Sequence, residues 1–356
     1  MARLKRVDCS EPGITRRRRG RGFEFLDSEG NRIDDSEELE RITELAIPPA
    51  WDQVWICVNP NGHLQATGID AAGRKQYLYH PLWRRRRDQQ KFAEMLDFAR
   101  ALPRARRRVA RDIKKDDLGR EQVLACSLRL LDCGFFRIGS EDYAEQNESY
   151  GLATMLKEHV TLNGTAITFD YPAKGGQRRV QSIVDAEVRR IVSELKQRRG
   201  GGSELLAYRE GRRWHDLGSA AINDYVKVAT GGDFSAKDFR TWNATMLAAV
   251  ALATDGGAGA TKTARKRAIT RAVKAVSFFL GNTPAVSRTS YIDPRVFDRY
   301  LSGWTIRGAI AGVDDPADIF RPRIRKRVEE AVLDLITDER SPVLEMIPAK
   351  REQVAA

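Results

Sequence analysis

Five polar residues have side chains suited to phosphoryl transfer without a metal ion. They are two arginines, a lysine, an asparagine and a tyrosine, namely Arg137, Lys174, Arg240, Asn282 and Tyr291. A tyrosine hydroxyl can attack a phosphate, and the planar guanidinium of arginine binds two phosphate oxygens without losing its charge. An amide N–H can donate to a further oxygen, and an ammonium group can protonate a leaving group. The set could therefore transfer a DNA phosphate to a protein side chain.

Each of the five residues lies in a short motif. Arg137 lies in Phe-Phe-Arg-Ile-Gly, Lys174 in Asp-Tyr-Pro-Ala-Lys-Gly-Gly, and Arg240 in Lys-Asp-Phe-Arg-Thr-Trp. Asn282 lies in Gly-Asn-Thr-Pro, and Tyr291 follows nine positions later in Arg-Thr-Ser-Tyr-Ile. Taken in this order, the motifs resemble those of the poxvirus-like bacterial type IB DNA topoisomerases, within the tyrosine recombinase and topoisomerase superfamily. The resemblance covers essentially the whole chain.

The resemblance implies a role for each residue. Tyr291 attacks a backbone phosphate and forms a 3′-phosphotyrosyl bond, while Lys174 protonates the leaving 5′ oxygen. Arg137, Arg240 and Asn282 stabilise the transition state. Poxvirus members carry a histidine at the position of Asn282, and an asparagine there can donate a hydrogen bond but cannot act as a general base. The implied reaction requires no ATP, no metal and no other cofactor.

The residues before Arg240 predict how its side chain is presented. Ser235 is a favourable N-cap residue and Asp238 would lie in the first turn, so a helix is predicted to start there. Lys237 and Arg240 are three positions apart and would share one helix face. A phosphate that approached this helix start would meet both side chains.

A β-hairpin is predicted around Lys174. Apolar residues alternate with polar ones over residues 167–171, and the Ala-Lys-Gly-Gly sequence that follows Pro172 is typical of a chain reversal. The pattern places Lys174 at the tip of the hairpin. An ammonium group on a hairpin tip could reach into a DNA groove.

Each of the five residues also has a plain structural interpretation. Arg137 and Arg240 could be solvated surface residues among the 61 lysines and arginines, and Lys174 could be an exposed turn residue. Asn282 could cap the C-terminus of a helix. Tyr291 is a weak nucleophile because a free phenol has a pKa of about 10, so nearby positive charge would be needed to favour the phenolate.

The resemblance also implies DNA contacts outside the catalytic set. The strand that matches residues 73–79 lies on DNA in the poxvirus-like enzymes, which implies contacts by Gln76 and Tyr77. Packing within the sheet is the alternative for Tyr77. Tyr143 matches a further DNA-contacting tyrosine, and Lys237 is expected to contact DNA beside the second catalytic arginine. A Ser-Glu-Asp sequence just before Tyr143 replaces basic residues of the poxvirus pattern, so a strong preference for the poxvirus cleavage sequence is not expected.

The residue patterns predict an α+β protein with two domains. Residues 1–88 contain short alternating strand patterns separated by turns, with one helix near residues 36–46, which predicts a small β-rich DNA-binding domain. Residues 89–356 are predicted to form a larger, mainly α-helical catalytic domain that contains the hairpin of Lys174. The resemblance implies that the two domains form a C-shaped clamp around duplex DNA.

Apolar residues recur at helical spacing in three parts of the predicted catalytic domain. These sets are Leu124, Leu128 and Leu131; Val184, Val188, Ile191 and Leu195; and Ile324, Val328, Ala331 and Leu335. Each set is expected to line one buried helix face. Glycine-rich residues 256–260 and the basic residues 261–267 after them are expected to form a flexible loop.

Composition restricts the class of protein. The chain has 356 residues and a net charge of +12, which favours a polyanionic partner. Its four cysteines show neither metal-ligand nor disulfide spacing, and no apolar run approaches the roughly 18 residues of a membrane span. The N-terminus lacks the apolar core of a signal peptide. We therefore expect a cytoplasmic, nucleoid-associated protein that binds duplex DNA but no membrane and no nucleotide cofactor, and the resemblance implies a monomer.

The predicted function is relaxation of supercoiled duplex DNA by transient cleavage of one strand. A tyrosine site-specific recombinase is the nearest alternative, but recombinases usually have His-x-x-Arg where this chain has Lys-Asp-Phe-Arg, and their N-terminal domain is helical. A non-catalytic basic DNA-binding protein would explain the charge, but it gives no reason for the positions of Tyr291 and Lys174. A metal-dependent nuclease would need a carboxylate cluster that the sequence does not suggest.

Overall fold

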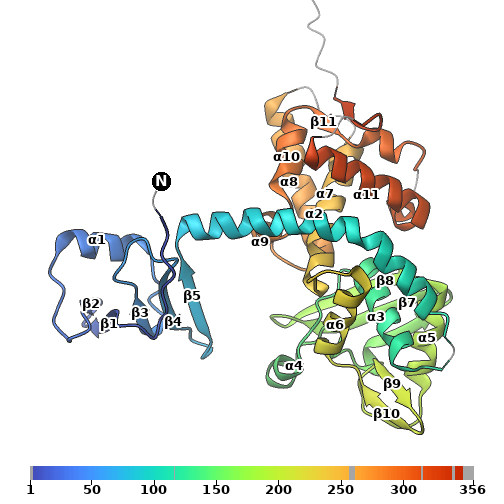
Figure 1. The fold of residues 1–356 in the computed structure, drawn as a ribbon, viewed down its shortest axis with the longest axis horizontal. Coiled ribbons are helices and arrows are strands. Elements are labelled where there is room, and N and C mark those ends of the chain that lie inside the picture. The colour runs from blue at the N-terminus through green and yellow to red at the C-terminus, as the bar shows by residue number, and fades with distance from the viewer. Residues whose placement is uncertain (1–2, 116, 256–260, 314–315, 339–340, 348–356) are drawn as a thin grey trace, which may run out of the picture. The chain divides into compact units, whose positions relative to one another are not determined.

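The computed structural model describes residues 3–115, 117–255, 261–313, 316–338 and 341–347. The chain divides into two compact units, Met1–Ala93 and Glu94–Ala356. The first unit is a sheet with one short helix, and the second consists mostly of helices with small sheets between them (Figure 1). The predicted α+β class is confirmed.

The first unit is built on a five-stranded antiparallel sheet with the strand order β2-β1-β3-β4-β5. Its elements are β1 (Ile14–Arg19), β2 (Gly22–Leu26), α1 (Ser36–Glu44), β3 (Asp52–Ile56), β4 (Leu64–Ile69) and β5 (Lys75–Tyr79). The core contains Ile14, Ile42, Val54, Ile56 and Ala66. The predicted strands and the helix near Ser36 are therefore present.

The arginine run of residues 16–19 forms part of strand β1, which the sequence patterns did not predict. Arg16 turns toward the chain after α1 and donates to the carbonyls of Ile47 and Pro48 at 3.3 and 3.1 Å. Arg17 pairs across the ladder with Glu24 at 2.5 Å. Consecutive arginines show no alternation of polar and apolar residues, so a pattern-based analysis has no signal for a strand here.

The second unit contains most of the helices. Helix α2 (Pro81–Asp112) begins in the first unit and continues across the division into the second, so the predicted boundary at residues 88/89 falls inside a helix. The remaining helices are α3 (Arg120–Gly134), α4 (Glu141–Asn147), α5 (Ala186–Gln197), α6 (Ser219–Thr230), α7 (Ala236–Thr254), α8 (Lys262–Leu280), α9 (Pro284–Ser290), α10 (Pro294–Leu301) and α11 (Pro322–Thr337). Within the described ranges, no helix is both long and apolar enough to cross a lipid bilayer.

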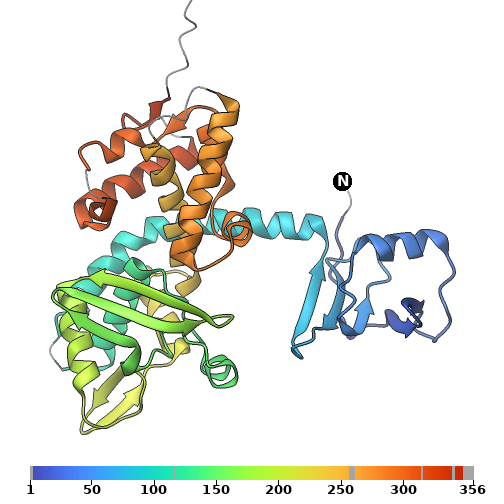
Figure 2. The ribbon, with the colours of Figure 1, turned by 180° about the vertical axis from the view of Figure 1, so that it is seen from behind.

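The second unit also contains short strands and 3-10 turns. These are η1 (Lys157–His159), β6 (Val160–Asn163), β7 (Ala166–Ala173), β8 (Gln177–Val184), β9 (Ala207–Glu210), β10 (Arg213–Asp216), β11 (Trp304–Thr305), η2 (Arg307–Ile310), η3 (Pro316–Phe320) and β12 (Glu345–Met346). The sheet β6-β7-β8 is antiparallel and packs on α3 and α5; Figure 2 shows this sheet from its open side. Strands β7 and β8 form the predicted hairpin.

The predicted helix faces are mostly confirmed. Leu124, Leu128 and Leu131 are buried on α3, and the apolar positions of α5 and α11 are buried apart from Ile324, which is partly exposed. Val184 is the exception, because it is the last residue of β8 and is 72% exposed. The helix that it was predicted to join begins only after Asp185, whose side chain accepts from the backbone N–H of Val188 and caps α5.

The prediction of a flexible basic loop was wrong for residues 261–267. Thr261 is the N-cap of α8, and its hydroxyl accepts from the backbone N–H of Ala264 at 3.1 Å. The basic residues that follow are good helix formers and occupy the first turns of this helix. Residues 256–260 lie outside the described ranges.

An ion cluster, which we call the inner ion cluster, joins four helices of the second unit. Its members are Arg106 on α2, Asp132 on α3, and Arg325 and Glu329 on α11. Arg106 pairs with Asp132 at 2.8 Å and with Glu329 at 2.6 Å, and Arg325 pairs with the same two carboxylates at 2.6 and 2.9 Å. Asn243 of α7 accepts from Arg325 at 3.0 Å. The cluster therefore fixes α3 and α7 relative to each other.

Candidate active site

Residues from four predicted motifs meet at the C-terminal end of α8. Arg137, which follows α3, donates to the carbonyl of Gly281 at 2.9 Å and to the side-chain oxygen of Asn282. Arg240 on α7 donates to the carbonyl of Leu280 at 2.9 Å, and its guanidinium lies 5.2 Å from the ring centre of Tyr291. Thus Arg137, Arg240, Asn282 and Tyr291, which are far apart in the sequence, lie close together in space.

The start of α7 positions Arg240. Ser235 is the N-cap, and its backbone N–H donates to the carboxylate of Asp238 at 2.7 Å, so the predicted capping is confirmed. Arg240 follows in the second turn and is only 4% exposed, whereas Lys237 remains in solvent. Lys237 and Arg240, which were predicted to share one helix face, therefore differ in their exposure to solvent.

The end of α8 supplies acceptors for the arginines. Gly281 takes the C-cap position with a φ of +59°, and the backbone N–H of Asn282 donates to the carbonyl of Ser277 at 3.2 Å. The last carbonyls of a helix lack partners within it and lie at the negative end of its dipole, which attracts cations. The C-cap is therefore Gly281, so the side chain of Asn282 is not needed for capping and binds Arg137.

Tyr291 lies in the short link between α9 and α10. Its backbone N–H donates to the carbonyl of Ser287 at 3.1 Å. The hydroxyl of Thr245, on α7, donates to the Tyr291 carbonyl at 3.3 Å and accepts from the backbone N–H of Asp293 at 3.1 Å. Ile292 and Asp293 are fully buried. The backbone that carries the tyrosine is therefore attached to the same helix as Arg240.

The positive charges around Tyr291 change how it titrates. Burial raises the pKa of the Tyr291 hydroxyl, but the charges of Arg240, Arg137 and Lys237 lower it, and the net result is a pKa below the usual value. Burial and the neighbouring charge of Arg137 also lower the pKa of Arg240 to about 10. The site thus makes the phenolate of Tyr291 easier to form than in a free tyrosine. It also disfavours the charged form of Arg240, because that charge is buried beside a second cation.

Two buried donors at the site have no acceptor among the described residues. They are Nε of Arg240 and Nδ2 of Asn282. The orientation of the Asn282 amide follows from its contact with Arg137, because a guanidinium can only donate and must face the amide oxygen. A buried donor without an acceptor costs about 1–3 kcal/mol, so unmatched donors often mark the place of an absent ligand. Here both donors would suit the oxygens of an anion.

Lys174 lies at the hairpin tip, as predicted. It is exposed in the turn between β7 and β8, where Gly175 and Gly176 adopt φ values of +80° and +70°. No hydrogen bond or ion pair involves its ammonium group within the described part of the chain. Tyr171, three residues before it on β7, is buried, and the charges of Arg179, Arg240 and Arg137 act on its hydroxyl. The part of the hairpin near Tyr171 therefore lies at the site, while the side chain of Lys174 is exposed to solvent.

Two of the proposed DNA-contact residues belong to the first unit. Gln76 and Tyr77 are on β5 in the first unit; Gln76 donates to Asp70 at 2.9 Å, and Tyr77 is 45% exposed with its ring stacked on Tyr79. The exposed ring of Tyr77 is not part of the sheet core. Tyr143 falls within α4 at a position whose side chain lies outside the described residues.

Sequence reasoning missed two residues of the site. Arg179 on β8 donates to the carbonyls of Phe278 and Phe279 at 2.7 and 2.6 Å, so it binds the same helix end as Arg137 and Arg240. Thr245 fixes the backbone from the carbonyl of Tyr291 to the N–H of Asp293. Arg179 pairs with Tyr171 across the predicted hairpin, so the pairing could have predicted that both side chains lie on the same face of the sheet. No local pattern indicates the contact of Thr245, which depends on tertiary packing.

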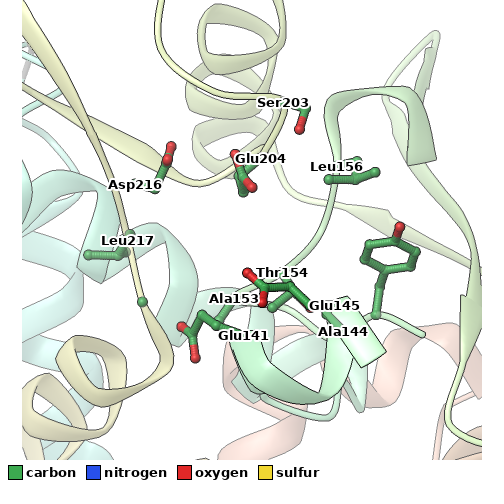
Figure 3. Close-up of a pocket in the computed structure, with 12 residues that line it drawn as sticks. Glu141, Ala144, Glu145, Ala153, Thr154, Leu156, Ser203, Glu204, Asp216 and Leu217 are labelled. Atoms are coloured by element: carbon green, nitrogen blue, oxygen red, sulfur yellow. The ribbon is translucent and has the colours of Figure 1, made fainter. Parts of the chain in front are cut away.

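A cavity of about 490 Å³ lies elsewhere in the second unit. Figure 3 shows carboxylates of Glu141, Glu204 and Asp216 among its lining residues. Burial and the charge of Glu204 raise the pKa of Asp216, so the cavity disfavours further negative charge. A phosphate would be repelled there, and this cavity is not the candidate active site. In the ranges that the structure describes, no group of three or more His, Cys, Asp or Glu side chains could hold a metal ion.

Comparisons with known proteins cover residues of both units. Residues 80–302, more than half of the chain, match the family described as eukaryotic DNA topoisomerase I, catalytic core, and residues 22–70 match the bacterial DNA topoisomerase IB N-terminal domain. DNA topoisomerase 1B of Acanthamoeba polyphaga mimivirus is 29% identical over 90% of this chain and 96% of its own length. The DNA topoisomerases of monkeypox virus and vaccinia virus are each 20% identical over 74% of this chain and 82% of their own length. These matches favour the topoisomerase interpretation over a recombinase or a non-catalytic DNA-binding protein, and the chain belongs, as an enzyme, to the type IB DNA topoisomerase family.

Proposed function

We propose that the protein relaxes supercoiled duplex DNA by forming a transient 3′-phosphotyrosyl bond through Tyr291. The observation that carries the proposal is the pair of unmatched buried donors on Arg240 and Asn282, beside a tyrosine whose pKa is lowered. A DNA phosphate would supply the missing acceptors and would sit next to the phenol. Since both donors are covered in the free protein, the side chains at the site must shift as the phosphate enters.

The chemical step needs only residues of this chain. The oxygen of Tyr291 bonds to phosphorus, its phenolic proton passes to water, and the bond from phosphorus to the 5′ oxygen breaks. Lys174 donates a proton to that oxygen, which leaves as a free hydroxyl. Arg137, Arg240 and Asn282 hold the charge that develops on the phosphate oxygens. The reverse steps reseal the strand, and because the phosphodiester energy is kept in the protein–DNA bond, neither ATP nor a metal ion is required.

The remaining parts of the proposal concern partners. Duplex DNA is the substrate, and the net charge of +12 supports binding through phosphate contacts. Gln76, Tyr77, Tyr143 and Lys237 are proposed DNA contacts, so that both units take part. One subunit contains all of the proposed catalytic residues, which supports a monomer. A DNA substrate also supports a cytoplasmic location with the nucleoid.

Relaxation of a supercoiled plasmid in EDTA and without ATP tests the proposal. We expect the wild type to relax the plasmid and to form a covalent complex with DNA, whereas Tyr291→Phe binds DNA nearly normally and does neither. Tyr300→Phe is a matched control, because Tyr300 is a buried tyrosine on the neighbouring helix α10 and has no proposed role in the reaction. Relaxation by Tyr291→Phe, or a requirement for a metal ion, would contradict the mechanism.

The proposed role of Lys174 has a separate test. Lys174→Ala should slow cleavage of ordinary DNA by about 10²- to 10⁴-fold, the range that a general acid contributes. A substrate with sulfur in place of the bridging 5′ oxygen has a leaving group that needs no proton. It should restore cleavage by this variant, and a failure of restoration would remove Lys174 from the acid role.

A further inference from the structure

Arg179 connects the hairpin of Lys174 to the end of α8. It lies on β8, five residues after Lys174, and donates to the carbonyls of Phe278 and Phe279 at 2.7 and 2.6 Å. These two carbonyls come four and three residues before Asn282. We propose that Arg179 is a positioning residue, which holds the hairpin against the end of α8 so that Lys174 reaches the leaving oxygen of the bound phosphate.

The space around Arg179 supports this assignment. Gly281, at the end of α8, lies directly against its side chain: a Cβ atom at position 281 would come within 2.9 Å of Cδ and 3.1 Å of Nε of Arg179. The φ of +59° at Gly281 also disfavours a side chain. The helix therefore ends in the one residue type that leaves room for the arginine.

The charge of Arg179 also argues for a specific role. Its side chain is half-buried, and burial together with the charge of Arg137 lowers its pKa. The carbonyls at the negative end of the α8 dipole offset this cost. A cation placed only for solubility would lie in water, away from a second cation.

The neighbouring Arg178 shows what an ordinary arginine does on this strand. Successive residues of a strand point to opposite faces, and Arg178 pairs on the other face with Asp170 at 2.5 Å. Its side chain is 76% exposed. Arg178 is therefore a matched control for Arg179, in the same strand and with the same side chain but without the contact to α8.

The inference rests on the proposed function, because it assigns Arg179 an effect through Lys174. Since the contact joins β8 to α8, its loss should leave the phosphate-binding arginines in place and release only the hairpin. The expected defect is thus confined to protonation of the leaving oxygen. A direct contact of Arg179 with the phosphate would instead slow cleavage whatever the leaving group.

Single-turnover cleavage of a DNA duplex with either oxygen or sulfur at the 5′ bridging position separates these possibilities. Arg179→Ala should slow cleavage of the oxygen substrate about 10- to 100-fold, below the full contribution of a general acid, and the sulfur substrate should restore it to within a few-fold. In the Lys174→Ala background, Arg179→Ala should add little. Arg178→Ala should show neither effect.

Two results would overturn the inference: a defect of Arg179→Ala that the sulfur substrate leaves unchanged, or a defect that multiplies with that of Lys174→Ala. If Arg179→Ala fails to fold, as judged by its melting curve, Arg179→Lys can still donate to one carbonyl and should show a smaller defect with the same restoration by sulfur. If Lys174→Ala is not restored by sulfur, the proposed acid and the inference both fail. If it is restored but neither Arg179 variant is, only the inference fails.

Discussion

Two groups of buried and partly buried arginines in the second unit differ in what they bind. In the inner ion cluster, Arg106 and Arg325 face the carboxylates of Asp132 and Glu329. At the candidate active site, the partners of Arg137, Arg179 and Arg240 among the described residues are carbonyl and amide oxygens and tyrosine hydroxyls, and none is a carboxylate. In the first group, the charges of the two arginines are balanced by two carboxylates. The second group has no carboxylate partner among the described residues, and under the proposed function a DNA phosphate would balance its charge.

The titration behaviour follows the same division. Burial lowers the pKa of Arg106, but Asp132 and Glu329 raise it, and the net pKa is raised. Burial raises the pKa of Asp132, but Arg325 and Arg106 lower it well below its usual value. By contrast, burial and Arg137 lower the pKa of Arg240 to about 10. Carboxylate partners thus distinguish the arginines of the inner ion cluster from the arginines that are proposed to bind a phosphate.

Residues that bind the inner ion cluster lie close in sequence to residues of the candidate active site. Asp132 and Arg137 lie on either side of the end of α3, and Arg240 and Asn243 lie three residues apart on α7. Substitutions a few residues apart should therefore affect stability in one case and chemistry in the other.

The largest expected effect is the loss of chemistry in Arg240→Ala. Removal of a guanidinium that stabilises phosphoryl transfer typically costs about 10³-fold or more in rate. We expect single-turnover cleavage to fall by this factor, while stability falls less than when the inner ion cluster is broken, because Arg240 donates to two carbonyls and pairs with no carboxylate among the described residues. A normal cleavage rate with a lowered melting temperature would show that Arg240 belongs with the structural arginines.

Arg325→Ala should have the opposite effect. Breaking a buried ion pair by removing one partner costs about 3–5 kcal/mol, because a charge is left uncompensated. Urea unfolding should show this loss, while cleavage per folded molecule stays within a few-fold of the wild type. Lys326→Ala is the control, since Lys326 lies next in sequence, is 74% exposed and pairs with Glu330 only at 3.7 Å. An Arg325→Ala variant that is as stable as the wild type but does not cleave DNA would contradict the distinction between structural and catalytic arginines.

An anion should stabilise the wild type by filling the site. Inorganic phosphate that binds only the folded state contributes about 2.7 kcal/mol at a concentration of 100 times its Kd. We expect thermal unfolding to move to higher temperature with phosphate but not with chloride at the same ionic strength. The shift should be lost in Arg240→Ala and kept in Arg178→Ala. An equal shift in all three proteins would indicate a general salt effect.

The smallest expected effect concerns the pH dependence of cleavage. The positive charge of Lys237 is one of those that lower the pKa of Tyr291, so its removal in Lys237→Gln should raise that pKa. The alkaline rise in cleavage rate, which follows formation of the phenolate, should then move to higher pH. The sulfur substrate isolates this step because its leaving group needs no proton. A shift to lower pH would contradict the assigned cause.

The sequence was sufficient to predict the elements that carry the site. The alternation before Lys174 identified the hairpin, and Ser235 with Asp238 identified the start of α7, because both signals are local. It was also sufficient to select Arg137, Arg240, Asn282 and Tyr291, which the structure brings together. Their catalytic roles remain predictions.

Other features could not be predicted because they depend on contacts between distant segments. Arg179 is one of two adjacent arginines, and only the position of α8 distinguishes it from Arg178. The inner ion cluster joins residues more than 190 positions apart, such as Asp132 and Arg325, so no spacing rule applies to it. Strand β1 was missed because its arginines carry no apolar alternation, and Arg16 is held by carbonyls whose place is set by tertiary structure.

The attachment of the Tyr291 backbone to α7 has a mechanical consequence. If the proposed protein–DNA bond forms, a swivelling DNA strand pulls on this residue with each turn. Thr245 holds the chain immediately after the pulled side chain, and the buried Asp293 caps the next helix. The pull on Tyr291 would therefore be transmitted to α7 and the helices packed on it, and not to a surface loop. Thr245 and Arg240 both lie on α7. The helix that would resist this pull is therefore also the helix whose arginine is proposed to bind the phosphate.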